Sequence, residues 1–288
     1  MKPVKIFLLL ISLGGAFTAS AQIPDLPDAH YNLLLEAPVT TWDEAIPLGN
    51  GLMGGLLWGE DNTIRLSLDR GDLWDERTSG EKEWWKKYTY QKGAEMIAQK
   101  KYDTVNRWWD GAYKGVSPTK LPAGRLEIKL PVDQVVKAFE LKLATAEGFA
   151  YFKSGAIVKA LYSANEPVAL LSVKGAVPDA IDLLSTSDVY HKNTGKDGGP
   201  SSGGSVSKLG YPDEIKGKRG NAKWYIQEAA EGLKYCVYME TKTNGKETLL
   251  AITITSTTDA DDFLSLAQKR CASALAKGYD VVRKSHVQ

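Results

Sequence analysis

A cluster of acidic side chains surrounds one tryptophan early in the chain. Asp69, Asp72, Asp75 and Glu76 flank Trp74. Carboxylates accept hydrogen bonds from hydroxyl groups, and an indole ring offers a flat apolar face. The cluster could therefore bind sugar hydroxyls, and the alternative interpretation is a solvated turn.

Inverting hydrolysis of a glycosidic bond needs an acid and a base carboxyl about 6.5–9.5 Å apart. Asp69, Asp72 and Glu76 are of the right residue type for such a pair. Residue type alone does not identify a catalytic pair, because the chain has 35 acidic residues. The three histidines lie in a lead-in, a loop edge and a terminal helical segment, and the chain has no nucleophile-elbow motif of the kind that serine hydrolases use. Neither the histidines nor the cysteines have the spacing of zinc ligands. A calcium site at Asp69, Asp72 and Asp75 lacks the alternate-residue pattern of known loops. We expect no catalytic residue, metal or cofactor here.

Four further tryptophans gather in a basic stretch that follows, from Thr78 to Gly115. They are Trp84, Trp85, Trp108 and Trp109. Apolar residues at helical spacing predict one or two helices inserted between strands. The indoles could form a platform for stacking sugar rings, or they could staple the inserted helices onto a sheet, since an indole buries a large apolar area.

The acidic cluster follows a predicted β-hairpin, in which Leu52–Trp58 and Thr63–Leu68 flank an acidic turn. From Leu121 the chain shows short alternating or apolar runs separated by turn residues, as in a β-sandwich. The fold class is therefore mainly β, a large antiparallel sandwich with inserted helices. The later predicted strands are 125–130, 135–144, 148–152, 155–162, 168–173, 224–229, 233–240 and 248–255.

Two other segments depart from this β pattern. Lys192 to Asn221 is rich in Gly, Ser, Pro and Lys, which predicts a flexible surface loop. Asp259 or Thr258 can cap a helix that Gly278 ends. Cys236 and Cys271 fall in a predicted strand and in this helix, and they could pair or remain separate core thiols.

The first 21 residues have the features of a secretory signal peptide. Two lysines precede an apolar run, and Ala19-Ser20-Ala21 provides a small-residue cleavage site. We expect cleavage after Ala21, a secreted or periplasmic location, and no membrane association of the mature chain. A net charge of +1 gives no electrostatic argument for binding nucleic acid.

The stretch from Trp42 to Trp74 resembles the amino-terminal domain of family 95 glycoside hydrolases, the inverting α-L-fucosidases and their relatives. The family usually shows Asn-Glu-Asp-Thr before the Leu-Trp pair, whereas this chain has Asp69, Arg70, Gly71 and Asp72, a difference that bears on which sugar is bound. A Pro-x-Gly strand and the Leu141–Ala146 strand extend the resemblance over nearly all of the mature chain. The matching positions in the first stretch are Trp42, 45–51, Gly54, Gly55, Trp58, Gly59 and 68–74.

The resemblance implies a domain arrangement and a role. Residues 22–258 would be the β-sandwich domain, and 259–288 a helical linker toward a catalytic (α/α)6 barrel that this chain lacks. The sandwich would dock on that barrel and rim its glycan pocket, and the chain alone would not catalyse hydrolysis. The implied rim residues are Trp42, Asn50, Asp69, Asp72 and Trp74.

Two alternatives remain open from the sequence. A stand-alone carbohydrate-binding module would bind glycan without turnover, and exposed tryptophans would favour it. An inactive truncated remnant would expose an apolar docking face and be poorly soluble.

Overall fold

The computed structural model describes residues 26–77, 88–110, 119–192 and 209–287. The predicted signal peptide and its cleavage site after Ala21 lie outside these residues, as do Trp84 and Trp85. Among the described residues, no helix is long and apolar enough to span a membrane.

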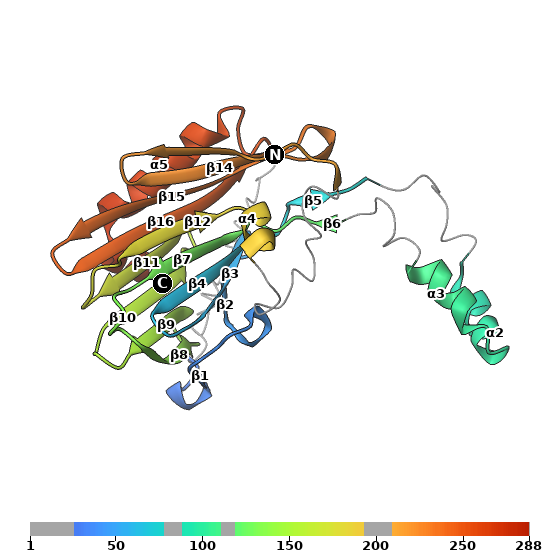
Figure 1. Ribbon diagram of the computed structural model, residues 1–288, viewed down its shortest axis with the longest axis horizontal. Helices are drawn as coiled ribbons and strands as arrows, with labels where there is room; N and C mark the ends of the chain where they lie inside the picture. Colours follow the sequence, from blue (N-terminus) through green and yellow to red (C-terminus); the bar gives the residue numbers. More distant parts are fainter. Residues whose placement is uncertain (1–25, 78–87, 111–118, 193–208, 288) are drawn as a thin grey trace, which may run out of the picture.

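Two antiparallel sheets make up most of the molecule (Figure 1). The larger has nine strands in the order β1-β8-β9-β10-β11-β16-β15-β14-β13, and the smaller has five in the order β12-β7-β4-β3-β2. The predicted mainly β fold with a large antiparallel sandwich is therefore confirmed. The strands of the larger sheet are β1 (Leu33–Glu36), β8 (Val136–Lys142), β9 (Glu147–Phe152), β10 (Ile157–Tyr162), β11 (Ala169–Lys174), β13 (Ile215–Arg219), β14 (Ala222–Glu228), β15 (Lys234–Asn244) and β16 (Glu247–Ser256). Those of the smaller sheet are β2 (Ile46–Gly49), β3 (Met53–Glu60), β4 (Thr63–Arg70), β7 (Arg125–Lys129) and β12 (Ala180–Leu184).

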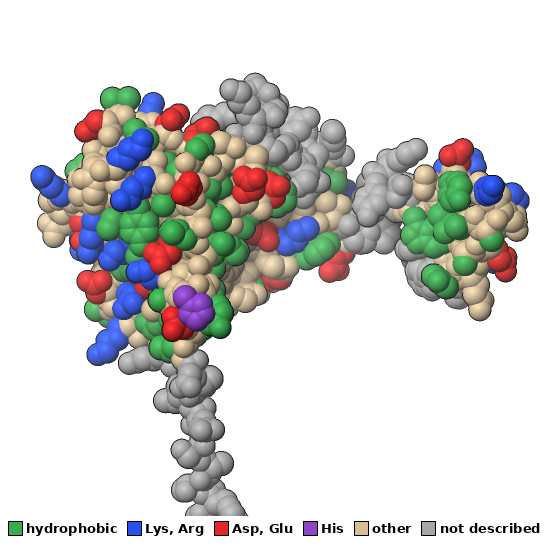
Figure 2. Space-filling view, turned by 90° about the horizontal axis from the view of Figure 1, so that it is seen from below, with side chains coloured by type: hydrophobic (Ala, Val, Ile, Leu, Met, Phe, Trp, Pro, Cys, Tyr) green, Lys and Arg blue, Asp and Glu red, His purple; other side chains and the backbone are tan. Residues whose placement is uncertain are grey.

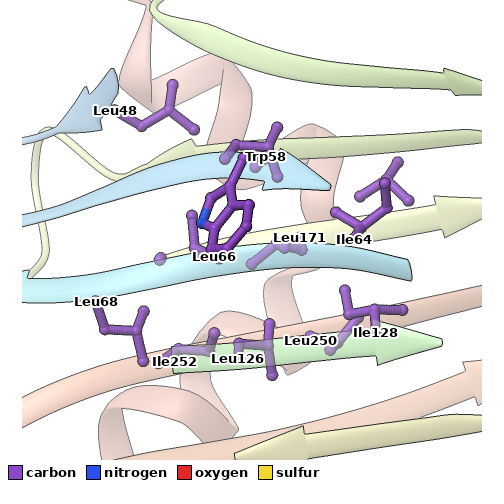
Figure 3. Packing of buried hydrophobic residues seen from close by; sticks show 14 of the residues in the cluster. Leu48, Trp58, Ile64, Leu66, Leu68, Leu126, Ile128, Leu171, Leu250 and Ile252 are labelled. Atoms are coloured by element: carbon purple, nitrogen blue, oxygen red, sulfur yellow. The ribbon is translucent and has the colours of Figure 1, made fainter. Parts of the chain in front are cut away.

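The main core lies between the two sheets (Figure 3). Every second residue of β4 is buried, because alternate side chains of a strand point to the same face. Leu66 and Leu126 of the smaller sheet belong to the same buried cluster as Leu171 and Ile252 of the larger one. This apolar layer fixes the register of both sheets, since a shift by one residue would turn it toward solvent.

Two helices cover the outer face of the larger sheet. They are α5 (Phe263–Lys277), which contacts β15 and β16, and α6 (Tyr279–His286). Ala267 and Cys271 of α5 pack in a second buried cluster with Leu170 of β11, which explains why β11 is buried on both faces. The N-cap is Asp262, whose side chain accepts from the Ser265 N–H at 3.0 Å, and not Asp259 or Thr258 as predicted.

The final helix is tied to the sandwich by a buried carboxylate. Glu147 of β9 accepts hydrogen bonds from the Tyr279 hydroxyl at 3.0 Å and from Arg283 Nε at 2.8 Å. The Ala164 N–H also donates to His286 Nδ1 at 3.2 Å. Residues 263–286 therefore pack against the sandwich along both helices.

A two-stranded ribbon carries the inserted helices. β5 (Trp74–Asp75) pairs with β6 (Thr119–Lys120), and between them lie α2 (Tyr90–Ala98) and α3 (Tyr102–Asp110). Figure 1 shows the two helices at the far end of this ribbon, apart from both sheets. The inserted helices predicted between strands are therefore present.

Part of the predicted loop between Lys192 and Asn221 is a strand. β13 pairs with β14 as an edge of the larger sheet, and the preceding α4 (Thr186–Lys192) was not predicted. The sequence of β13, Ile-Lys-Gly-Lys-Arg, has no alternating apolar pattern, because its side chains are mostly exposed. Residues 193–208 of this predicted loop lie outside the described residues.

The glycine pair in β3 gives a test of the sandwich. A Cβ at Gly55 would lie 2.2 Å from the Tyr162 hydroxyl of the facing sheet and 2.7 Å from Ser67 O, whereas a Cβ at Gly54 would meet only Leu48 O at 3.4 Å. We expect Gly55→Ala to lower the free energy of unfolding by about 1–3 kcal/mol, as overpacked cores do. Gly54→Ala is the matched control, and urea denaturation of both variants is the measurement. Equal stability of the two variants would contradict the close approach of the sheets at Gly55.

Candidate functional site

Several turns meet at one end of the sandwich. The Gly71 N–H donates to Leu52 O at 2.8 Å, which joins the turn after β4 to the turn between β2 and β3. The Asn50 side chain joins this second turn to the β10–β11 connection, because its amide donates to Ser163 O at 2.9 Å and Glu166 O at 3.3 Å. We call this region, formed by residues 50–53, 69–74, 119–121 and 163–167, the loop end.

Asn50 has a structural role in the loop end. Its side-chain oxygen accepts from the N–H groups of Leu52 and Met53 at 3.2 and 2.8 Å, while its amide binds the two carbonyls already named. Both polar atoms of this side chain are therefore engaged with backbone groups. Asn50 shapes the turn and links the sheets.

Three of the predicted rim residues lie close together in the chain, at the end of β4, in the turn that follows it and at the start of β5. Asp69 and Asp72 have side chains that are 50% and 46% exposed, and Trp74 is 44% exposed. The Trp74 Nε1–H donates to Gly71 O at 3.0 Å, so the indole is tied to its own turn. The result is an exposed aromatic ring beside two exposed carboxylates.

Trp42 lies elsewhere. It begins the short helix η2 (Trp42–Glu44), which precedes β2, and β2 starts at Ile46 opposite Leu57. Asn50 follows the other end of β2, so the strand separates Trp42 from the loop end. Trp42 is half-buried and packs against the main core.

Lys120 of β6 holds Asp69. Its ammonium group donates to Asp69 Oδ1 at 2.5 Å, to Arg70 O at 2.7 Å and to Leu121 O at 3.2 Å. An ammonium group has three N–H donors, so these three acceptors use all of them. Lys120 therefore fixes the ribbon against the end of β4.

Arg70 is the central residue that the sequence analysis did not single out. Its guanidinium is 2% exposed and binds Asp72 through Nε and Nη2 at 2.6 and 2.8 Å. It also binds Asp259 through Nη1 and Nη2 at 2.5 and 3.3 Å, and Nη1 donates to Ile254 O at 2.8 Å. The five N–H donors of the guanidinium are thus all used.

The charges of this network stabilise one another. Burial opposes ionisation of Arg70, but the hydrogen bonds and charges of Asp72 and Asp259 outweigh it and raise the pKa of Arg70. The hydrogen bonds from Arg70 lower the pKa of Asp72. The alternation of β4 was a signal for this site, since it places Arg70 on the same inward face as Leu68.

A second ion pair anchors the inserted segment. The Asp75 side chain is fully buried and accepts from Arg77 Nη2 at 2.7 Å and from the Tyr211 hydroxyl at 2.5 Å. Arg77 also donates to Leu209 O at 2.8 Å. Burial raises the pKa of Asp75, but the donors of Arg77 and Tyr211 outweigh it and bring the pKa below its ordinary value.

The described tryptophans of the proposed stacking platform lie on α3. A Cβ at Gly93 of α2 would be only 2.7 Å from the Trp109 ring, so this indole packs on the glycine backbone. Trp108 lies with its ring centroid 4.9 Å from that of Tyr88. These contacts join α2 to α3, not the helices to a sheet. Trp109 nevertheless remains 40% exposed, and Figure 2 shows hydrophobic side chains on the surface of this helical hairpin.

Three of the four carboxylates of the acidic cluster are bound to basic side chains. Asp69 binds Lys120, Asp72 binds Arg70 and Asp75 binds Arg77. Within the described ranges, no group of three or more His, Cys, Asp or Glu side chains is placed to hold a metal ion. Cys236 and Cys271 are both buried free thiols, and burial raises the pKa of Cys236 to about 12.

The comparison with protein families identifies the class of this domain. The family described as glycosyl hydrolase family 65, N-terminal domain, matches residues 33–181, which is just over half of the chain. The chain belongs to this family of domains associated with glycoside hydrolases. The match is to family 65 and not to family 95, so it supports the predicted resemblance at the level of a glycoside hydrolase N-terminal domain. No curated protein matches the chain.

The buried ion pairs of Arg70 give a prediction for stability. In Arg70→Met, Asp259 would keep a side chain that is 14% exposed without its main cationic partner. We expect the free energy of unfolding to fall by about 3–5 kcal/mol, as when one partner of a buried pair is removed. Urea denaturation measures this, with the exposed Arg219→Met as the control. A loss below about 1 kcal/mol would show that the network contributes little.

Asp75 gives a prediction for pH dependence. Because its folded-state pKa lies below the ordinary value of 3.8, its contribution to stability is present above about pH 4 and is lost as the pH falls through the folded-state value. Asp75→Asn should be less stable than wild type at neutral pH, and the difference should narrow below about pH 4. Denaturation at about pH 7, 5 and 3 tests this, with the exposed Asp213→Asn as the control. A stability difference between wild type and Asp75→Asn that stays constant over this pH range would contradict the lowered folded-state pKa of Asp75.

Proposed function

We propose that this chain is the N-terminal domain of a secreted or periplasmic glycan-degrading hydrolase, and that its loop end rims the sugar pocket of a catalytic (α/α)6 barrel. The observation that carries the proposal is that an exposed Trp74, bound to Gly71 O, follows the exposed carboxylates of Asp69 and Asp72 in one short segment. Membership in a family of glycoside hydrolase N-terminal domains supports it. The arrangement offers an apolar ring face and carboxylate oxygens to one ligand.

The chemistry of the loop end suits recognition. The hydrogen bonds from Arg70 lower the pKa of Asp72, so Asp72 does not match the protonated carboxyl that a glycosidase uses as its acid, and Asp69 is ion-paired with Lys120. The side chains are also fixed by their partners, which lowers the entropy cost of binding. In this proposal the barrel supplies the acid and the base, and the loop end orients the glycan.

The substrate class follows from the family 95 resemblance. We propose an α-L-fucosidase-like specificity for the whole enzyme, on the basis of the Trp42–Trp74 motifs. Asp69, Arg70, Gly71 and Asp72 replace the usual Asn-Glu-Asp-Thr, so contacts to the sugar at this turn would differ from those of the family.

A stand-alone carbohydrate-binding module is the second candidate. The exposed Trp109 on α3 and the exposed Trp74 favour it, since both could stack on sugar rings without a barrel. The two candidates differ in which tryptophan is needed. The loop end proposal depends on Trp74, and a platform on the helical hairpin depends on Trp109.

Binding of a fucosylated oligosaccharide to the isolated chain tests both candidates. We expect Lewis X trisaccharide to bind weakly, and Trp74→Ala to weaken binding by about tenfold or more, which corresponds to about 1.4 kcal/mol. Trp109→Ala is the matched control, and isothermal titration calorimetry is the measurement. Loss of binding only in Trp109→Ala would favour the helical hairpin instead.

A hydrolysis assay with an aryl α-L-fucoside is the second experiment. We expect the isolated chain to release no product from it, because the proposed catalytic groups lie on the barrel. Turnover that survives purification and is lost in Asp69→Asn or Asp72→Asn would overturn the proposal that the catalytic groups lie on the barrel and that the loop end only orients the glycan.

A further inference from the structure

We infer that the loop end accepts an uncharged, hydroxyl-rich sugar unit at Trp74 and rejects a sulfated or carboxylated one, because the exposed Asp69 and Asp72 offer hydrogen-bond acceptors and their cationic partners are already engaged. This inference rests on the proposed function, since it specifies the ligand of the same site. The inference concerns the sugar unit that contacts Trp74. It therefore predicts that the sulfated and unsulfated forms of one glycan bind with different affinity.

The cationic partners of Asp72 and Asp69 have no donor left for a ligand. The Arg70 guanidinium is buried and gives its five N–H groups to Asp72, Asp259 and the carbonyl of Ile254. Lys120 gives its three to Asp69 and to the carbonyls of Arg70 and Leu121. A sulfate or carboxylate at this surface would have to displace a carboxylate that is already bound.

The turn itself is also short of donors. The Gly71 N–H is bound to Leu52 O at 2.8 Å and the Leu73 N–H to Arg70 O at 3.1 Å. The indole N–H of Trp74 is bound to Gly71 O. These backbone N–H groups are therefore not available to form an anion-binding nest of the kind that holds phosphates.

Two other arginines are directed elsewhere. Arg77 binds Asp75, the neighbour of Trp74 in β5, and successive side chains of a strand point to opposite faces. Arg270 on α5 lies beyond Asp259, with Nη2 at 3.9 Å from that carboxylate, and its Nη1 atom is buried. Neither presents a free donor beside the exposed face of Trp74.

The groups that remain available are acceptors. Asp69 Oδ1 is bound to Lys120, and both oxygens of Asp72 are bound to Arg70, but each carboxylate oxygen can accept more than one hydrogen bond. Half of each side chain is exposed. Sugar hydroxyls can donate to these oxygens, whereas an anionic group would meet two carboxylates whose cationic partners, Arg70 and Lys120, have all their donors engaged. Like charges in contact are repelled, and this repulsion gives the site its selectivity.

Three related oligosaccharides test the inference on the intact chain: Lewis X, its 3′-sulfated form and its sialylated form. We expect the two anionic probes to bind at least about tenfold more weakly than Lewis X at low salt. The difference should shrink as salt is added, because the charges at this exposed site are screened. Calorimetric titrations at about 0.02 and 0.5 M salt provide the measurement.

Asp69→Asn provides a variant with the opposite expectation. It removes one negative charge and frees the ammonium group of Lys120, so the 3′-sulfated probe should bind this variant at least as tightly as Lewis X does. Asp213→Asn, an exposed carboxylate outside the loop end, is the matched control and should keep the wild-type preference. A circular dichroism spectrum and a urea titration check that both variants are folded.

The outcomes separate the inference from the proposed function. If the sulfated probe binds wild type as tightly as Lewis X and both depend on Trp74, the selectivity is wrong and the sugar site stands. If no probe binds, or if binding is unaffected in Trp74→Ala, both the site and the inference are overturned. Weaker anionic binding that is reversed in Asp69→Asn and kept in Asp213→Asn supports both.

Discussion

The buried guanidinium of Arg70 is the interaction on which the loop end depends. It lies at the end of β4, where the apolar inner face of the smaller sheet gives way to turns. It binds Asp72 in its own turn, the carbonyl of Ile254 in β16 of the larger sheet, and Asp259 just after that strand. A single side chain therefore closes the core, links the two sheets and fixes the carboxylate next to Trp74. An ion pair placed this way is more effective in defining a geometry than in adding stability, because removing its charges from water offsets much of their attraction.

The sequence predicts those parts of the fold that depend on local pattern. β3 and β4 follow from their apolar runs, and the hairpin between Asn244 and Glu247 turns at a glycine, as tight hairpins favour, with Gly245 at a φ of 59°. β13 could not be recognised, because an exposed edge strand needs no apolar alternation and obtains its hydrogen bonds from β14. Likewise Asp259 takes the role of an Arg70 partner from 189 residues away, and no local pattern indicates such a contact.

The candidate site, like the fold, was predictable from the sequence only in part. Asp69, Asp72 and Trp74 are close in sequence, and the turn after β4 keeps them together. Trp42 belongs to the same sequence motif but lies beyond the other end of β2, since a motif records which residues occur together and not where a strand takes them. Arg70 was foreseeable as a buried charge from the alternation of β4, but the identity of its partners was not. The sequence thus predicts which residue types form the site. Only the tertiary contacts show which charged partners these residues have and which of their atoms are free to bind a ligand.

The ribbon formed by β5 and β6 has a consequence for how this domain can vary among related proteins. Asp75 and Thr119 lie opposite each other in the ribbon, so the inserted segment leaves and re-enters the sandwich at adjacent positions. A segment with adjoining ends can be lengthened, shortened or exchanged with little change in the entropy of loop closure. The buried contact between Asp75 and Tyr211 holds the base of the ribbon independently of what lies beyond it. The sandwich is thus a frame to which different appendages can be attached, beside the residues proposed to meet the sugar.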